Sequence, residues 1–191
     1  QALLKMAERS DVLTYEFENV DLASLEAAQK LAALPQGTNL LYVTSDRLRE
    51  KHFLASHELP VTPYQPVSNP TELNDAITKL GYPCILKSCE GGYDGHGQQD
   101  INSEDDLPAG RSLASQTPCI LEKRQKFSKE LSVMVTRSRD GQVRCFPVAE
   151  NIHHNHILHQ SIVPARVTEE VQQKAQKIAR QIAQGLCLRG V

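Results

Sequence analysis

Residues 87–98 read Lys-Ser-Cys-Glu-Gly-Gly-Tyr-Asp-Gly-His-Gly-Gln and follow the apolar run Cys84-Ile85-Leu86. The apolar run predicts a buried strand that ends at Lys87. The four glycines after it predict a loop whose backbone N–H groups can approach a phosphate closely. The ammonium group of Lys87 would add a point charge for phosphate oxygens. This stretch therefore predicts a strand, a phosphate-covering loop and a second strand near Gln98–Ile101.

The loop differs from the two best-known phosphate-binding loops. The pattern GxxxxGK[ST] is absent, and a strand rather than a helix is expected after the glycines. Two interpretations therefore stay open on the residues alone. One is a loop that holds a phosphate, and the other is a glycine-rich hairpin beside a surface lysine.

Carboxylates placed near strand ends form a second group of candidates. Glu122 lies in the run Cys119-Ile120-Leu121-Glu122-Lys123, and Glu130 comes further along the chain. Glu16 and Glu18 follow a predicted strand at residues 12–15. Such carboxylates can accept hydrogen bonds from ribose hydroxyls, although an exposed glutamate is more often only solvated.

Two polar runs have an open role. The run His153-His154-Asn155-His156, with His159 nearby, has the composition of a metal site. No cysteine or carboxylate stands at zinc spacing, so polar contacts near a ligand are the preferred interpretation. In Asp46–Lys51, basic and acidic residues alternate on a predicted helix, which favours an ion-paired solvated face over a phosphate clamp.

The other patterns predict an α+β architecture that mixes helices with antiparallel hairpins. Helices are expected at residues 21–32, 46–57, 70–80 and 168–186, with a short helix in 103–117 that Pro108 and Gly110 interrupt. Strands are expected at residues 12–15, 62–67, 84–87, 98–101, 120–122, 131–136, 143–148, 157–163 and 188–191. Asp140-Gly141 predicts a hairpin turn, and Asn69 predicts the cap of the third helix.

Composition limits the class of protein. The chain has 191 residues, is 40% hydrophobic and 23% charged, and carries a formal net charge of −2. These values fit an ordinary globular protein and give no basic block for nucleic-acid binding. No apolar run approaches the roughly 20 residues of a membrane span, and the N-terminal residues lack the apolar segment of a signal peptide. The five cysteines include no CxxC pair, which is typical of reduced thiols, so a cytoplasmic location is expected.

Taken together and in this order, the motifs resemble the 5-(carboxyamino)imidazole ribonucleotide synthase family of the ATP-grasp superfamily. The resemblance covers nearly the whole chain, and its most specific parts are the Gly-Gly-Tyr-Asp-Gly and Tyr-Glu-Phe-Glu-Asn stretches. The segments that carry it are residues 14–20, 46–51, 81–83, 86–87, 91–98, 120–122, 150–153 and 161–166.

The resemblance implies an ATP-grasp fold in three parts. Residues 1–44 would be the remnant of an N-terminal α/β domain, and residues 45–121 the small ATP-grasp subdomain with a glycine-rich flap. Residues 122–191 would begin the large subdomain. The family's magnesium carboxylates are expected beyond Val191, so the chain is expected to be an internal fragment that is inactive by itself.

The resemblance also implies roles at a nucleotide site. Arg47 and Lys87 would be catalytic cations on the ATP phosphates. Glu130 would bind the ribose, and His153 would lie near the nucleotide. The flap over the nucleotide would consist of Gly92, Tyr93, Asp94, Gly95, His96, Gly97 and Gln98. Adenine would be bound by Glu122, Lys123, Arg124 and Gln125.

A second set of residues is implied for the other organic substrate. Tyr93, Asp94 and His96 would contact 5-aminoimidazole ribonucleotide, with Glu16 or Glu18 on the other side of the cleft. His96 stands where the family usually has Arg or Lys. Because an unperturbed histidine titrates near neutrality, this contact is expected to depend on pH.

The implied reaction is an ATP-driven carboxylation. Bicarbonate attacks the γ-phosphate to give carboxyphosphate, and the amino group of the ribonucleotide then takes up the carboxyl group. ATP and magnesium are the implied cofactors, and the full-length protein is expected to be a homodimer without nucleic-acid or membrane partners. Two alternatives stay open: another ATP-grasp ligase, directed at formate or biotin, and a catalytically inactive nucleotide-binding module.

Overall fold

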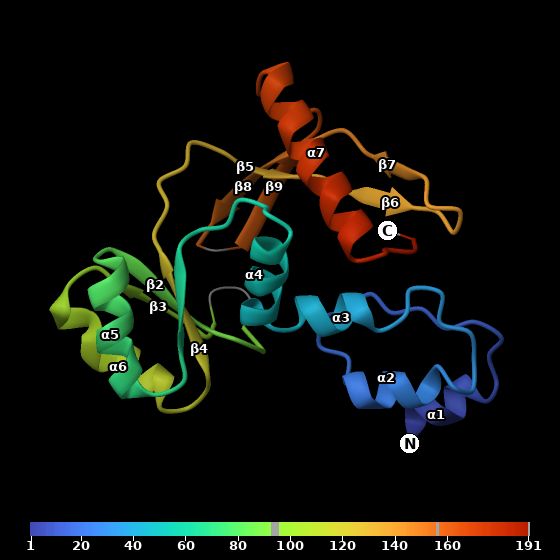
Figure 1. Ribbon diagram of the computed structural model, residues 1–191, viewed down its shortest axis with the longest axis horizontal. Coiled ribbons are helices and arrows are strands. Elements are labelled where there is room, and N and C mark those ends of the chain that lie inside the picture. Colours follow the sequence, from blue (N-terminus) through green and yellow to red (C-terminus); the bar gives the residue numbers. More distant parts are fainter. Residues whose placement is uncertain (93–95, 156, 191) are drawn as a thin grey trace. The chain divides into compact units, whose positions relative to one another are not determined.

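The computed structural model describes residues 1–92, 96–155 and 157–190, which form two compact units (Figure 1). Unit 1 consists of Gln1–Ser45, Lys129–Ile152 and the segment that begins at Gln160. Unit 2 consists of Asp46–Ser128 and His153–His159. The division into three domains that the resemblance implies stays a prediction.

The centre of unit 2 is a four-stranded antiparallel sheet with strand order β1-β4-β2-β3. Its strands are β1 (Tyr64–Val67), β2 (Cys84–Ser88), β3 (Gln98–Ile101) and β4 (Cys119–Lys123). The four strands predicted in this region are confirmed. Side chains alternate between the two faces of a sheet, so Leu86 and Leu121, which pair directly, share the core face. Ile85 and Glu122 pair on the opposite face.

Two helices cover the core face of this sheet (Figure 1). They are α5 (Pro70–Leu80) and α6 (Leu107–Ala114), and the short 3-10 helix η1 (Glu104–Asp106) precedes α6. The predicted cap of α5 is confirmed, because the Asn69 side chain accepts hydrogen bonds from the two N–H groups of Thr71 and Glu72 at 3.0 and 3.1 Å.

The expectation that Pro108 and Gly110 interrupt the helix predicted in residues 103–117 is wrong. Both residues lie inside α6, since Pro108 occupies the first turn, where a missing N–H group costs nothing. A Cβ atom on Gly110 would lie 2.9 Å from Cδ1 of Ile101 and 3.0 Å from Cδ2 of Leu73. Glycine therefore lets α6 approach the sheet and α5 closely.

The helix α4 (Arg47–Ser56) confirms the helix predicted at residues 46–57. Asp46 caps it, and its carboxylate accepts from the N–H groups of Leu48 and Arg49 at 2.8 and 2.9 Å. No residue of α4 is fully buried, and its apolar side chains Leu48, Phe53 and Leu54 are half-buried. Polar contacts to the rest of unit 2 add to this partial burial.

The N-terminal part of unit 1 contains α1 (Ala2–Ala7), α2 (Leu22–Ala28) and α3 (Asn39–Thr44). The helix α2 confirms the predicted helix after Asp21, although it ends earlier than residue 32. The strand predicted at residues 12–15 is reduced to a single bridge between Val12 and Ala33. The helix α3 was not predicted, because its Leu-Leu-Tyr-Val run is equally typical of a strand.

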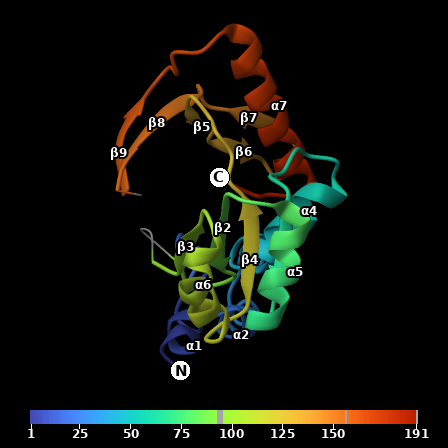
Figure 2. The ribbon, with the colours of Figure 1, turned by 90° about the vertical axis from the view of Figure 1, so that its left-hand side faces the viewer.

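The remaining elements are two small groups of strands and a long helix, which belong to unit 1 apart from residues 153–159. β5 (Glu130–Ser132), β8 (Ala149–His154) and β9 (Ile157–Ile162) form one sheet, and Figure 2 shows β8 and β9 side by side. β6 (Val135–Arg137) and β7 (Val143–Cys145) form the hairpin that Asp140-Gly141 predicted. The last helix, α7 (Glu169–Gly185), confirms the predicted amphipathic helix.

Two strand predictions in unit 1 need correction. The single strand expected at residues 131–136 is two strands, since β5 pairs with β8 while β6 pairs with β7. The strand expected at residues 188–191 is reduced to a bridge between Arg137 and Gly190, and Val191 lies outside the described residues. Among the helices that the structure describes, none has the length and apolarity needed to cross a bilayer.

A buried carboxylate ties three segments of unit 1 together. Glu150 on β8 is only 5% exposed. Its two oxygens accept from Nε and Nη2 of Arg166 at 3.1 and 2.7 Å, and Lys129 Nζ lies 2.9 Å from Oε2. Asn151 also accepts from the hydroxyl of Ser161 at 2.9 Å. Two separate motifs of the sequence, residues 150–153 and 161–166, therefore form one hydrogen-bonded structure.

This ion-paired group predicts a pH-dependent stability. Hydrogen bonds from Arg166 and Lys129 lower the pKa of the Glu150 carboxyl from 4.5 to about 2. A lowered pKa contributes stability above pH 4.5, and this contribution is lost as the pH falls toward 2. We expect Glu150→Gln to lower the melting temperature by roughly 5 °C at pH 7.

Thermal unfolding measured from pH 7 to pH 2.5 tests this expectation, with exposed Glu8→Gln as the control. The difference between wild type and Glu150→Gln must shrink as the pH falls below the ordinary glutamate range. A difference that stays constant with pH would mean that the carboxylate charge is not what stabilises this region.

Candidate functional site

A buried carboxylate also lies at the centre of a polar cluster in unit 2. Glu122 on β4 is 8% exposed. Its Oε2 accepts from Lys87 Nζ at 2.8 Å, and its Oε1 lies 3.3 Å from Lys51 Nζ. One carboxylate thus serves two ammonium groups, and we call these three residues the Glu122 cluster.

The cluster follows from strand register and helix periodicity. Glu122 pairs with Ile85, and Lys87 lies two residues further along β2, so both charged side chains extend from the same face of the sheet. Lys51 lies four residues after Arg47 on α4, which places both side chains on one side of that helix. The cluster therefore forms only when the ends of β2 and β4 and one face of α4 come together.

The cluster holds Glu122 in its charged form. Burial by itself disfavours the carboxylate and raises its pKa. The hydrogen bond and charge of Lys87, together with those of Lys51, outweigh this effect, so the pKa of Glu122 is lowered overall. At neutral pH the site contains two cations and one anion, and its local charge suits an anionic ligand.

Arg47 fastens the beginning of the glycine-rich loop. Its Nη1 donates to the carbonyl of Ser88 at 2.8 Å, and its Nη2 donates to the carbonyl of Gly92 at 3.3 Å. Its own N–H donates to the carbonyl of Cys89 at 3.0 Å. Arg47, the residue predicted to bind phosphate, thus also holds the glycine-rich loop by three hydrogen bonds.

The base of the loop is closed by Ser88 and two glycines. The N–H of Ser88 donates to the carbonyl of Gly97 at 2.7 Å. A Cβ atom on Gly97 would lie 2.6 Å from Ser88 Oγ, and one on Gly92 would lie 3.0 Å from the carbonyl oxygen of His96. Gly97 also has a φ of +70°, which favours glycine. Tyr93, Asp94 and Gly95, which complete the predicted flap, lie outside the described residues, while Gln98 opens β3.

The residues predicted to bind adenine divide into two groups. Glu122 belongs to the cluster, but Lys123 directs its Nζ to the carbonyls of Gly81 and Tyr82 at 3.2 and 2.7 Å. Arg124 donates to Asn102 and pairs with an aspartate on β3, and Gln125 is exposed. Any contact from residue 123 to adenine would therefore come from its backbone.

The remaining predicted residues lie elsewhere in the chain. Glu130 is in β5 of unit 1, where it pairs with Asn151. His153 is the second-last residue of β8 and is exposed, and the rings of His154 and His159 are 4.8 Å apart. Within residues 1–92, 96–155 and 157–190, no group of three His, Cys, Asp or Glu side chains is placed to hold a metal ion.

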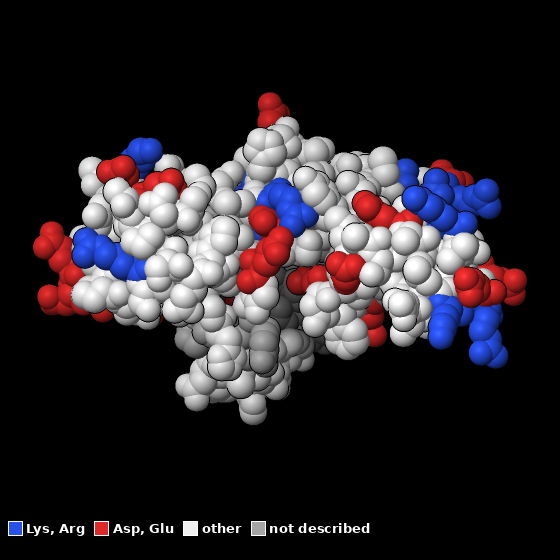
Figure 3. Space-filling view, turned by 90° about the horizontal axis from the view of Figure 1, so that it is seen from below, with Lys and Arg blue, Asp and Glu red and all other residues white. Residues whose placement is uncertain are grey.

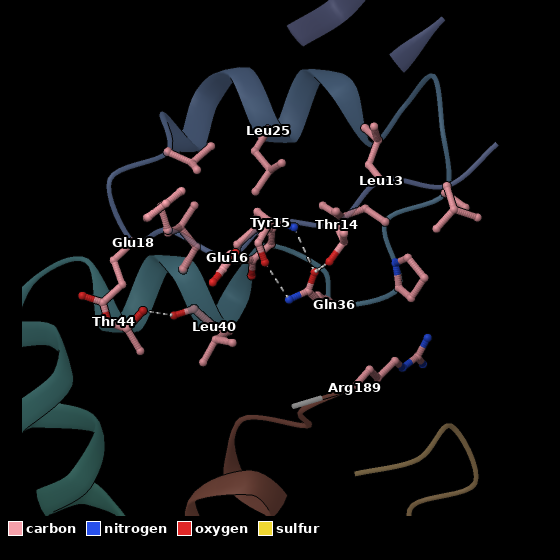
Figure 4. Close-up of a pocket in the computed structure, with 18 of the residues that line it drawn as sticks. Leu13, Thr14, Tyr15, Glu16, Glu18, Leu25, Gln36, Leu40, Thr44 and Arg189 are labelled. Atoms are coloured by element: carbon pink, nitrogen blue, oxygen red, sulfur yellow. Dashed lines mark hydrogen bonds between the residues drawn. The ribbon is translucent and has the colours of Figure 1, made fainter. Parts of the chain in front are cut away.

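Unit 1 contains a groove of about 1640 Å³, drawn in Figure 4. Glu16 and Glu18, the predicted substrate contacts, both line it. Gln36 fixes the neighbouring backbone, since its Oε1 accepts from Thr14 and from the Tyr15 N–H at 2.6 and 3.2 Å. The groove thus presents two carboxylates from a hydrogen-bonded segment.

Lys51 and Ser88 are site residues that the sequence interpretation missed. Lys51 was assigned to a solvated ion-paired face, yet its side chain is only 17% exposed. Its spacing of four from Arg47 is the signal that points to a shared helix face. On the face drawn in Figure 3, acidic and basic side chains are interspersed.

Comparisons with known proteins bear on this geometry. A family model described as the ATP-grasp domain matches residues 52–191. The chain is 47% identical over 190 residues to the N5-carboxyaminoimidazole ribonucleotide synthase of Bacillus subtilis (strain 168), covering 100% of this chain and 50% of that protein. The chain thus spans about half the length of the curated relatives it matches.

Solved structures give the same picture. A crystal structure of an ADP complex of N5-carboxyaminoimidazole ribonucleotide synthetase matches with a TM-score of 0.94 and 51% identity, over 98% of this chain and 50% of that one. The Aspergillus clavatus enzyme in complex with ADP and 5-aminoimidazole ribonucleotide matches with a TM-score of 0.88 and 28% identity, over 99% and 49%. These matches confirm the predicted α+β ATP-grasp fold and the resemblance drawn from the motifs.

The closed loop base predicts a specific effect of one methyl group. Gly97→Ala must push its Cβ against Ser88 Oγ, so we expect the hydrogen bond between the Ser88 N–H and the carbonyl of residue 97 to open. Hydrogen exchange of the Ser88 amide should become at least about tenfold faster, because the 2.6 Å contact between Cβ and Ser88 Oγ comes on top of the left-handed strain that an alanine brings to either glycine.

Gly91→Ala is the matched control, because Gly91 has a φ of +72° but no atom within 4 Å of its Cβ position. It carries the same backbone strain without the contact. Equal exchange rates in the two variants would show that the contact with Ser88 does not close the loop base.

Proposed function

Because the chain belongs to the ATP-grasp family, we propose that it is the nucleotide-binding part of an enzyme that carboxylates 5-aminoimidazole ribonucleotide with ATP and bicarbonate. The observation that carries the proposal is the Glu122 cluster beside the glycine-rich loop. It stands in a chain that is 47% identical over 190 residues to an N5-carboxyaminoimidazole ribonucleotide synthase.

The proposed ATP site uses cations that already lie together in unit 2. Lys87 is 26% exposed at its side chain, so its ammonium group can leave Glu122 for a phosphate oxygen. Arg47 lies at the start of the loop and offers a second cation. The loop that Ser88 and Gly97 close would cover the phosphates and exclude water, which would protect a hydrolysable intermediate.

The chemistry of the proposal is positioning and charge neutralisation. A bicarbonate oxygen attacks the γ-phosphorus of ATP, and the bond to the β,γ-bridging oxygen breaks to release ADP. The amino group of the ribonucleotide then attacks the carbon of carboxyphosphate, and inorganic phosphate leaves. Lys87 and Arg47 would offset the charge that the transferred phosphoryl group carries.

Magnesium is implied by the family, but the residues described in this chain do not fit it, because they contain no suitable group of His, Cys, Asp or Glu side chains. Bicarbonate as carboxyl source, a homodimeric full-length protein and a cytoplasmic location belong to the same proposal and rest on the resemblance.

The ribonucleotide is assigned to the groove of unit 1. Glu16 and Glu18 line that groove and are exposed, so their carboxylates are accessible to ribose hydroxyls or the amino group. The order that Gln36 gives to the preceding backbone would reduce the entropy lost when a ligand binds. Tyr93 and Asp94 remain proposed contacts outside the described residues, and His96 remains a proposed contact beside them.

The first test measures ADP release by the full-length protein with bicarbonate, with and without 5-aminoimidazole ribonucleotide. We expect strong dependence on the ribonucleotide, and a fall in kcat/KM of roughly 100-fold in Lys87→Ala, because the positive charge that offsets the charge of the transferred phosphoryl group is lost. Lys79→Ala, which removes an exposed lysine of α5, should leave the rate unchanged.

ADP release that is indifferent to the ribonucleotide would leave an ATP-grasp enzyme with another acceptor, such as formate or biotin. A Lys87→Ala variant with the wild-type rate would remove the phosphate role of Lys87. An absence of ADP release under all conditions would favour a nucleotide-binding module without catalysis.

The groove generates a separate prediction about one substrate. Glu16→Gln and Glu18→Gln keep the side-chain shape and remove the charge. At least one should raise KM for the ribonucleotide about tenfold, which is typical of a lost hydrogen bond to a charged group. KM for ATP should stay unchanged, since neither Glu16 nor Glu18 is assigned to ATP and the proposed phosphate cations lie in unit 2.

Steady-state kinetics with each substrate varied in turn checks this, with Glu8→Gln as the control for charge in unit 1. If both variants keep the wild-type KM for the ribonucleotide, the groove is not its binding site.

A further inference from the structure

The helix α4 is held by charged contacts as well as by its half-buried apolar side chains. None of its residues is fully buried. Arg47 reaches the carbonyls of the glycine-rich loop, Arg49 pairs with Glu90 at 2.8 Å, and Lys51 reaches Glu122. The first two contacts hold the N-terminal turn of α4. The contact of Lys51 is different, because it goes to a buried carboxylate that another cation already serves.

Glu122 divides its two oxygens between two lysines. Lys87 donates to Oε2 at 2.8 Å, while Lys51 lies 3.3 Å from Oε1. The side chain of Lys51 is less exposed than that of Lys87, at 17% against 26%. Lys87 is therefore the more accessible of the two cations, and Lys51 is the one enclosed with the carboxylate.

The division of the Glu122 oxygens between two lysines has a consequence for the binding of an anion. A phosphate that takes Lys87 removes the shorter of the two contacts to Glu122. Removing one partner of a buried ion pair is strongly unfavourable when the remaining charge has no other partner. Lys51 is the cation that remains, and it comes from a different element than Lys87.

We infer that Lys51 is a positioning residue for nucleotide binding: it keeps Glu122 ionised and in place while Lys87 moves from that carboxylate to a phosphate. This inference rests on the proposed ATP site. Lys51 acts through Glu122 and does not itself touch the nucleotide. Lys51 lowers the free energy needed to move Lys87 from Glu122 to the phosphate. ATP therefore binds more tightly, while the rate of the chemical step changes little.

A double-mutant cycle in the full-length protein tests this, with the dissociation constant of ATP and the steady-state kcat and KM as readouts. Lys51→Met keeps the aliphatic length and removes the charge, and Lys51→Arg restores the charge. Both are combined with Glu122→Gln, which removes the carboxylate. Lys79→Met is the control for loss of one positive charge in unit 2.

Lys51→Met should raise the dissociation constant and KM for ATP about tenfold, which corresponds to roughly 1.4 kcal/mol. The value of kcat should change less than about twofold, and Lys51→Arg should recover most of the affinity. In the Glu122→Gln background, Lys51→Met should change ATP affinity by less than about twofold, because the residue through which it acts is gone. Lys79→Met should bind ATP like wild type.

Three results would overturn the inference while leaving ATP binding intact. One is wild-type affinity in Lys51→Met. Another is the same tenfold loss in the Glu122→Gln background, which would make Lys51 a direct nucleotide contact. The third is a loss of ATP affinity that Lys51→Arg does not recover and that accompanies a lowered melting temperature. Lys51 would then only attach α4 to the sheet. If the wild-type protein itself fails to bind ATP, the proposed function falls first and this inference falls with it.

Discussion

The need to keep a buried carboxylate charged and paired governs the structure of unit 2. Glu122 is 8% exposed in the middle of a sheet whose other face is apolar core. It is stable there because Lys87 on β2 and Lys51 on α4 both reach it. Strand register, the placement of α4 and the starting point of the glycine-rich loop are all constrained by this one requirement.

Unit 1 uses the same physical arrangement for another purpose. Glu150 is as buried as Glu122 and also has two cationic partners, Lys129 and Arg166. Arg166 donates to both carboxylate oxygens from two nitrogens, which fixes the relative orientation of the two side chains and favours a stable ion pair. Glu122 is served by two flexible lysines instead, one of which is partly exposed beside a loop of glycines. The Glu150 ion pairs and the Glu122 cluster thus differ in the type of cation and in its surroundings. This difference suits the first to a structural role and the second to ligand binding.

Local signals decided which parts of the fold the sequence could predict. The cap at Asn69, the buried strand before Lys87 and the Asp140-Gly141 turn depend on neighbouring residues, and all were confirmed. The split of residues 131–136 between β5 and β6 depends on two different partner strands, so no local pattern contained it. Lys51 was missed for the same reason: its partner stands 71 positions away on β4, by the difference between residue numbers 122 and 51.

A crystal structure of the full-length protein with ADP or ATP bound is the most direct test of the phosphate role of Lys87. We expect Lys87 Nζ to lie about 3 Å from a phosphate oxygen, while Lys51 Nζ stays within hydrogen-bond distance of the Glu122 carboxylate. The glycine-rich loop between Ser88 and Gly97 should lie against the same phosphates. A nucleotide bound elsewhere, or a Lys87 that stays on Glu122 with the nucleotide in place, would contradict the central claim.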